Sequence, residues 1–297
     1  MAALTHRAVF VIRETDYEAL IARHATSGQA RFFLESRGQK LEDVVERHER
    51  FHAVLSRARA SVPGEWRQAL VRRADLDRFL FAADDVVVAV GQDGLVANVA
   101  KYLGAQPVIG VNPAPDLYDG ILVRVAVERL GQVLTASVNG AAQVERRTMV
   151  KAVLDHGETL FALNEIFVGH RSHQSARYRV EAAGEAEDQS SSGLIVASGT
   201  GVTGWARSIA EATHLALPLG TEEAAVGYWV REPFPSVASG TRLRAGKLTD
   251  AGLLVTSRMN DGGVVFADGI EQDFLAFEWG RQVRLSPADR TLNLAIG

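Results

Sequence analysis

The chain has 297 residues, no cysteine and a formal net charge of −4. The lack of cysteine excludes a disulfide framework, thiolate metal sites and a cysteine nucleophile. The negative charge argues against broad nucleic-acid binding, and 47% hydrophobic with 23% charged residues is typical of a soluble globular protein. The length fits one large domain or two moderate ones.

The first residues do not resemble a targeting signal. The apolar run at 8–12 is too short for the core of a signal peptide, and Arg13, Glu14 and Asp16 follow it closely. No run of about 18 apolar residues occurs, so no membrane-spanning helix is expected. We therefore expect a cytoplasmic protein without a membrane partner.

The first hundred residues predict alternating strands and helices. Continuous apolar runs predict buried strands, and apolar residues at helical spacing predict amphipathic helices. The predicted strands are 7–15, 65–73, 84–90 and 107–113, and the predicted helices are 15–24, 40–62 and 95–104. This order indicates a Rossmann-like parallel sheet covered on both faces, in an α/β lobe spanning 1–114.

From about residue 114 onward the pattern changes to short strand-like stretches separated by Gly-, Asn- or His-containing turns. The stretches 121–127 and 132–154 are among them, and 205–217 is the one predicted helix. The polar stretch 181–193 is expected to form an exposed hairpin tip. We expect an all-β lobe over 115–280, with 281–297 packing back on the first lobe.

The first candidate for chemistry is the turn Gly91-Gln92-Asp93-Gly94, between a predicted strand and helix. Glycines there let backbone amides approach an anion, and a helix N-terminus favours negative charge. Asp93 would repel a phosphate unless it binds magnesium or accepts a proton from a hydroxyl that attacks the phosphate. The competing interpretation is a tight turn in which Asp93 caps its own helix.

A second glycine-rich stretch, 199–204, has the spacing G-x-G-x-x-G. A dinucleotide fingerprint also needs an acidic residue about 20 positions later, at the tip of the next parallel strand. Glu222 and Glu223 lie near that distance but not at a strand end, and the preceding strands have an antiparallel pattern. We therefore expect a Gly- and Thr-rich ligand loop of another kind.

Asn164 and Glu165 interrupt an otherwise apolar strand-like stretch. Burying such a pair is unfavourable unless both side chains find partners. Two interpretations stay open: a strand end with both side chains in water, or a pair that hydrogen-bonds ribose hydroxyls or an amide of a ligand. The pair Arg146-Arg147 could receive a phosphate, but a solvated face is the simpler expectation.

In this order, the three segments resemble the ATP-dependent NAD kinase family, in which an α/β lobe with a G-G-D-G turn precedes an all-β lobe with an Asn-Glu or Asn-Asp pair and a Gly/Thr-rich stretch. The mitochondrial-type branch is the more similar one. The segments that resemble it are ALNEIFVG, SSGL followed by GTG, PVIGVNP with a later DG, VVERHERFH and DGGVVFADG. The resemblance implies the two-domain architecture of NAD kinases.

The resemblance also implies residue roles. Asp93 would be the base or ligand near the 2′-hydroxyl of the adenosine ribose of NAD. The other implied residues bind nucleotide: Gly91, Gln92 and Gly94 at the ATP phosphates, and Asn164, Glu165, Thr203, Trp205 and Ser208 at the NAD. Mg²⁺ would act with ATP as phosphoryl donor, no residue is assigned as a metal ligand, and a homodimer or larger assembly is implied.

The turn departs from the family pattern G-G-D-G-T, since Gln92 and Leu95 replace a glycine and a hydroxyl-bearing residue. If the second position needed a positive φ, glutamine there would cost about 1 kcal/mol or more. We expect a kinase that converts NAD(H) to NADP(H). The alternative is a catalytically impaired nucleotide-binding or sensing homologue. A lipid or sugar kinase and a Rossmann dehydrogenase are weaker alternatives.

Overall fold

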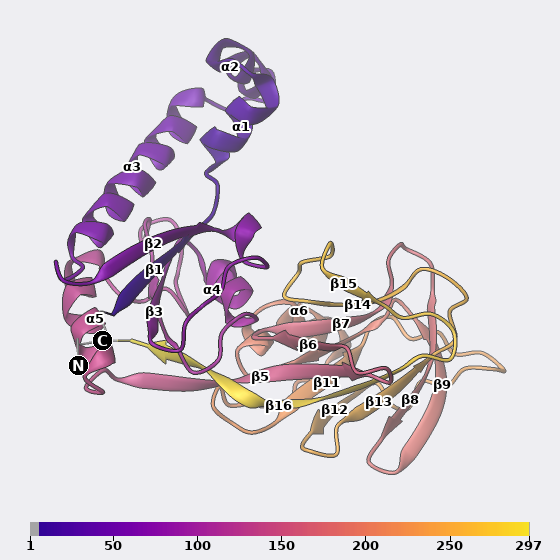
Figure 1. Ribbon diagram of the computed structural model, residues 1–297. Coiled ribbons are helices and arrows are strands. Elements are labelled where there is room, and N and C mark those ends of the chain that lie inside the picture. The colour runs from indigo at the N-terminus through magenta and orange to yellow at the C-terminus, as the bar shows by residue number, and fades with distance from the viewer. Residues whose placement is uncertain (1–5, 297) are drawn as a thin grey trace. The chain divides into compact units, whose positions relative to one another are not determined.

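The computed structural model describes residues 6–296 and divides the chain into two compact units. The first comprises Met1–Glu145 with Asn293–Gly297, and the second comprises Arg146–Leu292. The elements of both are labelled in Figure 1. Within 6–296, no helix has the length and hydropathy needed to cross a membrane.

The first unit is built on a parallel sheet. Its strands are β1 (Arg7–Ile12), β2 (Arg67–Arg72), β3 (Asp85–Val90) and β4 (Pro107–Val111), in the spatial order β2-β1-β3-β4. The end of β16 (Gln282–Ala295) pairs in parallel with β4 over 293–295. β3 is buried along its whole length, as expected for a central strand covered on both faces. The predicted parallel sheet is confirmed.

Helices cover this sheet. α3 (Leu41–Ala60) and α5 (Leu130–Val138), which follows a 3₁₀ turn at Val127–Arg129, share one core with β1 and β3. α4 (Asp93–Ala100) connects β3 to β4, and another 3₁₀ turn at Arg73–Asp75 follows β2. The β3–α4 turn that carries Asp93 is thus fixed by a buried strand before it and a largely buried helix after it.

Two short helices pack against the N-terminal half of α3 and away from the sheet of their unit (Figure 1). They are α1 (Asp16–His24) and α2 (Ser27–Glu35). Their small core consists of Ala30, Leu34, Leu41 and Val44. Thr15 begins α1 with a capping box that involves Glu18. We call α1, α2 and the N-terminal half of α3 the helical extension.

The second unit contains antiparallel sheets. One has the order β12-β11-β10-β7-β14-β15, and the other has β16-β13-β8-β9, with β5 pairing with β16 and β6. The bounds are β5 Val144–Leu154, β6 Thr159–Ala162, β7 Glu165–His170, β8 Ala176–Ala182, β9 Glu185–Ser191, β10 Leu194–Ala197, β11 Val226–Val230, β12 Ala245–Leu248, β13 Leu253–Ser257, β14 Gly263–Ala267 and β15 Phe274–Ala276. One α-helix, α6 (Trp205–Thr213), follows a 3₁₀ turn at Gly201–Thr203. The two-part α/β plus β-rich fold class is therefore confirmed.

Several elements differ from the expected ones. The two compact units divide the chain after 145 and after 292, whereas the expected first lobe spans 1–114 with 281–297 packing back on it; α5 shares its core with the parallel sheet. The stretch at 132–154 was predicted as strand, but its first part is α5. The expected exposed tip at 181–193 is mostly strand β9, in which Glu187, Gln189 and Ser191 are buried.

Candidate functional site

The predicted site residues fall into two groups, and each is described within its own unit. In the first unit, Gln92 is the residue that precedes α4, with φ −102° and ψ 168°. This is extended backbone that any residue adopts, so the second position of the turn imposes no left-handed conformation and glutamine carries no such cost. Gln92 is exposed and makes no capping hydrogen bond with its side chain.

The carboxylate of Asp93 is bound by a separate backbone loop. Its Oδ1 accepts the N–H groups of Leu122 at 2.8 Å and Val123 at 3.2 Å, and its Oδ2 accepts the N–H of Ile121 at 2.9 Å. The loop also lies close to β4, since a Cβ atom at Gly110 would be 2.1 Å from the carbonyl oxygen of Leu122. Asp93 therefore fixes the loop at 121–123 to the start of α4 and does not cap its own helix.

The two glycines of the turn differ in their surroundings. A Cβ atom at Gly91 would be 3.1 Å from Leu95 Cδ2, whereas one at Gly94 would meet no atom within 4 Å. Leu95 is 4% exposed and belongs to the core, so it offers no polar group to the turn. Protein packing therefore does not require a glycine at 94, which leaves close approach of a ligand as a reason for it.

In the second unit, Asn164 and Glu165 lie at the start of β7, where an aspartate holds the backbone. Asp268 accepts the N–H groups of Leu163 at 3.0 Å, Asn164 at 2.8 Å and Glu165 at 3.3 Å. The N–H of Asp268 donates to the carbonyl oxygen of Glu165 at 3.0 Å. Four hydrogen bonds thus fix the backbone from which both predicted side chains project.

The side chains themselves are not engaged by the protein. Glu165 is 9% exposed, and neither its carboxyl group nor the Asn164 carboxamide hydrogen-bonds to any residue within 6–296. Burial, reinforced by the negative charge of Asp268, raises the pKa of Glu165 from 4.5 to about 8. At neutral pH this carboxyl group is protonated, so it can both donate and accept a hydrogen bond.

The glycine-rich stretch at 199–204 packs against the Asn164 segment. A Cβ atom at Gly201 would be 2.1 Å from the carbonyl oxygen of Asn164. The Ser198 hydroxyl donates to the carbonyl oxygen of Leu163 and accepts the N–H groups of Thr200 and Gly201. The preceding β10 pairs antiparallel with β7 and β11, so this stretch is a packing loop and not a dinucleotide-binding turn.

Thr203, Trp205 and Ser208 lie at this loop and the first turns of α6. Thr203 and Ser208 are exposed, and the Thr203 hydroxyl donates to the carbonyl oxygen of Thr200 at 2.8 Å. The half-buried indole of Trp205 stacks on Phe167 with 5.8 Å between ring centroids. The guanidinium of Arg231 lies 5.0 Å from the centre of the same indole. Any base stacking on Trp205 would share it with these two side chains.

A hollow of about 870 Å³ lies along α6. Its lining is mainly apolar and includes Ala206, Ala210, Leu217 and Trp229. None of the site residues predicted from the sequence lines it, although the lining residues Val202, Ala206 and Arg207 are chain neighbours of three of them.

Sequence reasoning missed two residues that shape the second group. Asp268 lay within DGGVVFADG, but its partners are about a hundred positions away in the chain. Arg147 was expected on a solvated face, yet it is 3% exposed and its Nη1 donates to the hydroxyl of Thr200 at 3.2 Å. The neighbours of Arg147 in the chain are Glu145, Arg146 and Thr148, so the local sequence carried no signal of its burial.

Over about half of its length, the chain is similar in sequence to curated NAD kinases. No protein-family model matches the chain. An NAD kinase of Chlorobaculum tepidum is 28% identical over 157 residues, covering 51% of this chain and 50% of the relative. An NAD kinase of Acidovorax sp. strain JS42 is 32% identical over 132 residues, covering 42% and 43%. The chain thus spans about half the length of the curated relatives it matches.

Two solved structures align over nearly the whole chain. Yeast NADH kinase complexed with NADH has a TM-score of 0.60 at 15% identity, covering 99% of this chain and 84% of that one. An NAD kinase from Archaeoglobus fulgidus in complex with ATP has a TM-score of 0.57 at 18% identity, covering 97% and 93%. The chain therefore has the fold of NAD kinases, and about half of its sequence is similar to theirs.

Proposed function

We propose that this protein is a phosphotransferase that moves the γ-phosphoryl group of ATP to the 2′-hydroxyl of the adenosine ribose of NAD(H), giving NADP(H). The observation that carries the proposal is the pair Asn164 and Glu165. Their backbone is fixed by Asp268, and their side chains have no partner within 6–296. Polar groups held in place without partners are suited to bind a ligand.

The protonation state of Glu165 fits a ribose as that ligand. A protonated carboxyl group donates one hydrogen bond and accepts another, and each ribose hydroxyl does the same. The Asn164 carboxamide adds a donor and an acceptor. Together the two side chains match the paired hydroxyls of a ribose, since each side chain offers both a donor and an acceptor.

We propose Asp93 as the residue that accepts the proton of the 2′-hydroxyl. The hydroxyl oxygen would form its bond to the γ-phosphorus while the bond to the ADP oxygen breaks, and the proton would pass to the carboxylate. The three backbone N–H groups on Asp93 fix its orientation. Gly91, Gln92 and Gly94 would lie at the phosphates of ATP, near the N-terminus of α4.

The divalent cation expected with ATP has no evident protein ligand at this turn. Both oxygens of Asp93 already accept backbone N–H groups, an arrangement that suits an oriented carboxylate better than a cation ligand. Mg²⁺ would therefore be bound by the phosphates of ATP, where it neutralises charge. Thr203, Trp205 and Ser208 would line the pocket for the nucleotide of NAD.

The competing proposal is a homologue that binds nucleotides without catalysis, and it rests on Gln92 and Leu95. The extended φ of Gln92 removes backbone strain as an argument for it. Two features still support a non-catalytic homologue: the exposed side chain of Gln92 at the turn, and the lack of a hydroxyl group at Leu95. Following the sequence resemblance, we further propose membership of the mitochondrial-type branch and a homodimer or larger assembly. We propose a cytoplasmic location from the sequence pattern of the first residues.

A product assay separates the two functions. The purified chain with ATP and Mg²⁺ should convert NAD or NADH to the 2′-phosphorylated product, and polyphosphate should be compared as donor. Calorimetry on the same samples measures binding. Binding of NAD(H) without product from any donor would favour the sensing homologue, and absence of both would refute the proposed function.

A further inference from the structure

Two histidines of α3 and a glutamate of α1 lie close together in the first unit, and none of them is among the residues assigned above. His48 and His52 are four positions apart on α3, so they project from the same face of the helix. Glu18 lies on α1, which packs against α3. A carboxylate oxygen and one ring nitrogen from each histidine all lie within 4.8 Å of one another.

The nitrogen of His52 that faces this cluster has no hydrogen-bond partner. His52 Nε2 is shielded from solvent and bonds to no residue within 6–296, although the side chain as a whole is 43% exposed. The nearest charged atom is Glu18 Oε1, at 3.7 Å, which is too long for a hydrogen bond. A buried ring nitrogen without a partner is unfavourable unless another group satisfies it.

The other histidine is oriented by Thr15. The Thr15 hydroxyl lies 2.8 Å from His48 Nδ1 and 3.1 Å from Glu18 Oε2, so its single proton serves only one of these two contacts. If the proton is donated to Glu18, His48 Nδ1 donates to the hydroxyl oxygen and Nε2 keeps its lone pair. In either case Thr15 fixes the orientation of the ring, as hydrogen-bonding neighbours commonly do for histidines around a bound metal.

The carboxylate of Glu18 is oriented by Thr15. Its Oε2 accepts the Thr15 N–H at 2.8 Å and lies 3.1 Å from the Thr15 hydroxyl, so Oε1 is the oxygen that faces His52. One carboxylate oxygen and one nitrogen of each imidazole therefore lie within one small volume.

We propose that Glu18, His48 and His52 form a binding site for a divalent transition cation of the zinc type, which would join α1 to α3. Two imidazoles and one carboxylate are a preferred ligand set for Zn²⁺ and Co²⁺, whereas Mg²⁺ prefers oxygen ligands alone. Ligands at about 2.1 Å from zinc lie about 3.4 Å apart, so modest side-chain rotations close the site. A water molecule would complete four-coordination.

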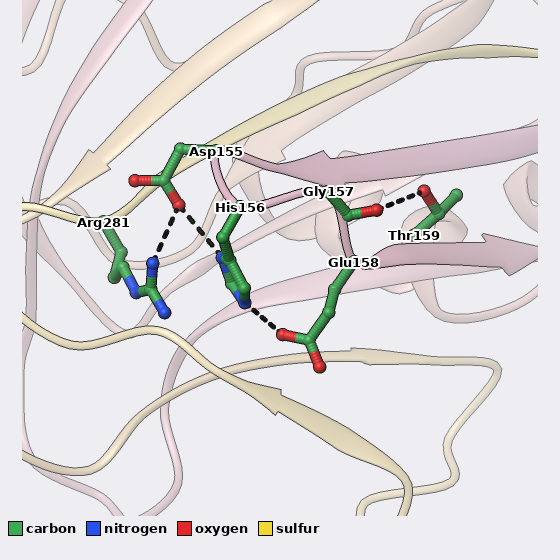
Figure 2. Close-up of polar contacts among 6 residues, drawn as sticks. All are labelled: Asp155, His156, Gly157, Glu158, Thr159 and Arg281. Atoms are coloured by element: carbon green, nitrogen blue, oxygen red, sulfur yellow. Dashed lines mark hydrogen bonds and ion pairs between the residues drawn. The ribbon is translucent and has the colours of Figure 1, made fainter.

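Another histidine of the chain provides the contrast. His156, in the turn between β5 and β6, has a carboxylate at each ring nitrogen: Asp155 at Nδ1 and Glu158 at Nε2 (Figure 2). Asp155 also accepts a hydrogen bond from Arg281 at 3.3 Å (Figure 2). Because both nitrogens of His156 already have partners, this turn is not the proposed site, and it serves as a control.

The test is a titration of the metal-free full chain with Zn²⁺ and with Co²⁺, without nucleotide, followed by calorimetry and by the visible absorption of bound Co²⁺. We expect one equivalent to bind, with no competition from Mg²⁺. His52→Gln and Glu18→Gln should weaken binding by ten-fold or more. Thr15→Val should weaken it about ten-fold, the usual effect of losing a group that orients a ligand, and Thr15→Ser should restore it.

Controls separate this site from general histidine binding and from misfolding. His156→Gln and the exposed His173→Gln should bind Zn²⁺ as the unmodified chain does. The circular dichroism of each metal-free variant should be unchanged. No binding below millimolar Zn²⁺, loss of binding in His156→Gln, or several equivalents insensitive to His52→Gln would each overturn the proposal. None of these measurements depends on kinase activity.

Discussion

The raised pKa of Glu165 makes the stability of this protein depend on pH in a predictable direction. In the native state the carboxyl group keeps its proton up to about pH 8, whereas the unfolded chain loses it near 4.5. Between these values the native state binds more protons than the unfolded state, so stability falls as pH rises. Below 4.5 both states are protonated and the effect vanishes.

The magnitude follows from the two pKa values. Each pH unit in this window changes the free energy of unfolding by about 1.4 kcal/mol, so the full effect is on the order of 5 kcal/mol as an upper bound. Glu165→Gln keeps the shape of the side chain and removes its titration. The variant should match the unmodified chain near pH 4 and be more stable by up to that amount at pH 9.

The assay is urea unfolding at pH 4, 7 and 9, followed by tryptophan fluorescence. Glu271→Gln, at an exposed turn of the same unit, is the matched control and should leave stability unchanged at every pH. A difference between Glu165→Gln and the unmodified chain that is the same at pH 4 and pH 9 would refute the reasoning. Asp268→Asn should shift the pH dependence to lower pH, because it removes the neighbouring negative charge.

Two further predictions concern the loops around the candidate site. Gly201→Ala should lower the free energy of unfolding by about 2 kcal/mol or more, because its Cβ would be 2.1 Å from the carbonyl oxygen of Asn164. Gly94→Ala should leave stability nearly unchanged, because its Cβ meets no protein atom within 4 Å. Urea unfolding midpoints measure both variants, and equal destabilisation by the two would contradict the prediction. Asp93→Asn should abolish product formation and increase amide hydrogen exchange at 121–123; unchanged exchange there would disprove the anchoring role.

Several features of the fold follow from the sequence through local rules. The apolar runs that become β1, β3 and β4 predicted a parallel sheet because a strand covered on both faces has no polar side. The antiparallel pattern before 199–204 correctly argued against a dinucleotide-binding turn. Each of these inferences needs only neighbouring residues, which is why the sequence was sufficient for them.

Other elements were misread for the same local reason. The stretch that contains α5 is rich in valine and threonine, which favour strands, but packing on the parallel sheet makes it helical. The stretch that contains β9 is polar, yet Glu187 is buried because it accepts the N–H groups of Arg242 and Leu243. The donors of these hydrogen bonds are more than fifty residues away in the chain, so the local sequence pattern could not predict them.

The sequence by itself determined the order of the motifs, the two-part α/β and β-rich organisation, and the residue types available for chemistry. Only the tertiary structure decided what those residues do. In the structure, the carboxylate of Asp93 accepts hydrogen bonds from the amides of 121–123, and that of Asp268 accepts them from the amides of Asn164 and Glu165. Glu18 lies close to two histidines of α3. The physical reason is that pKa values, hydrogen bonds and metal ligation depend on spatial neighbours, and folding brings those neighbours from distant parts of the chain.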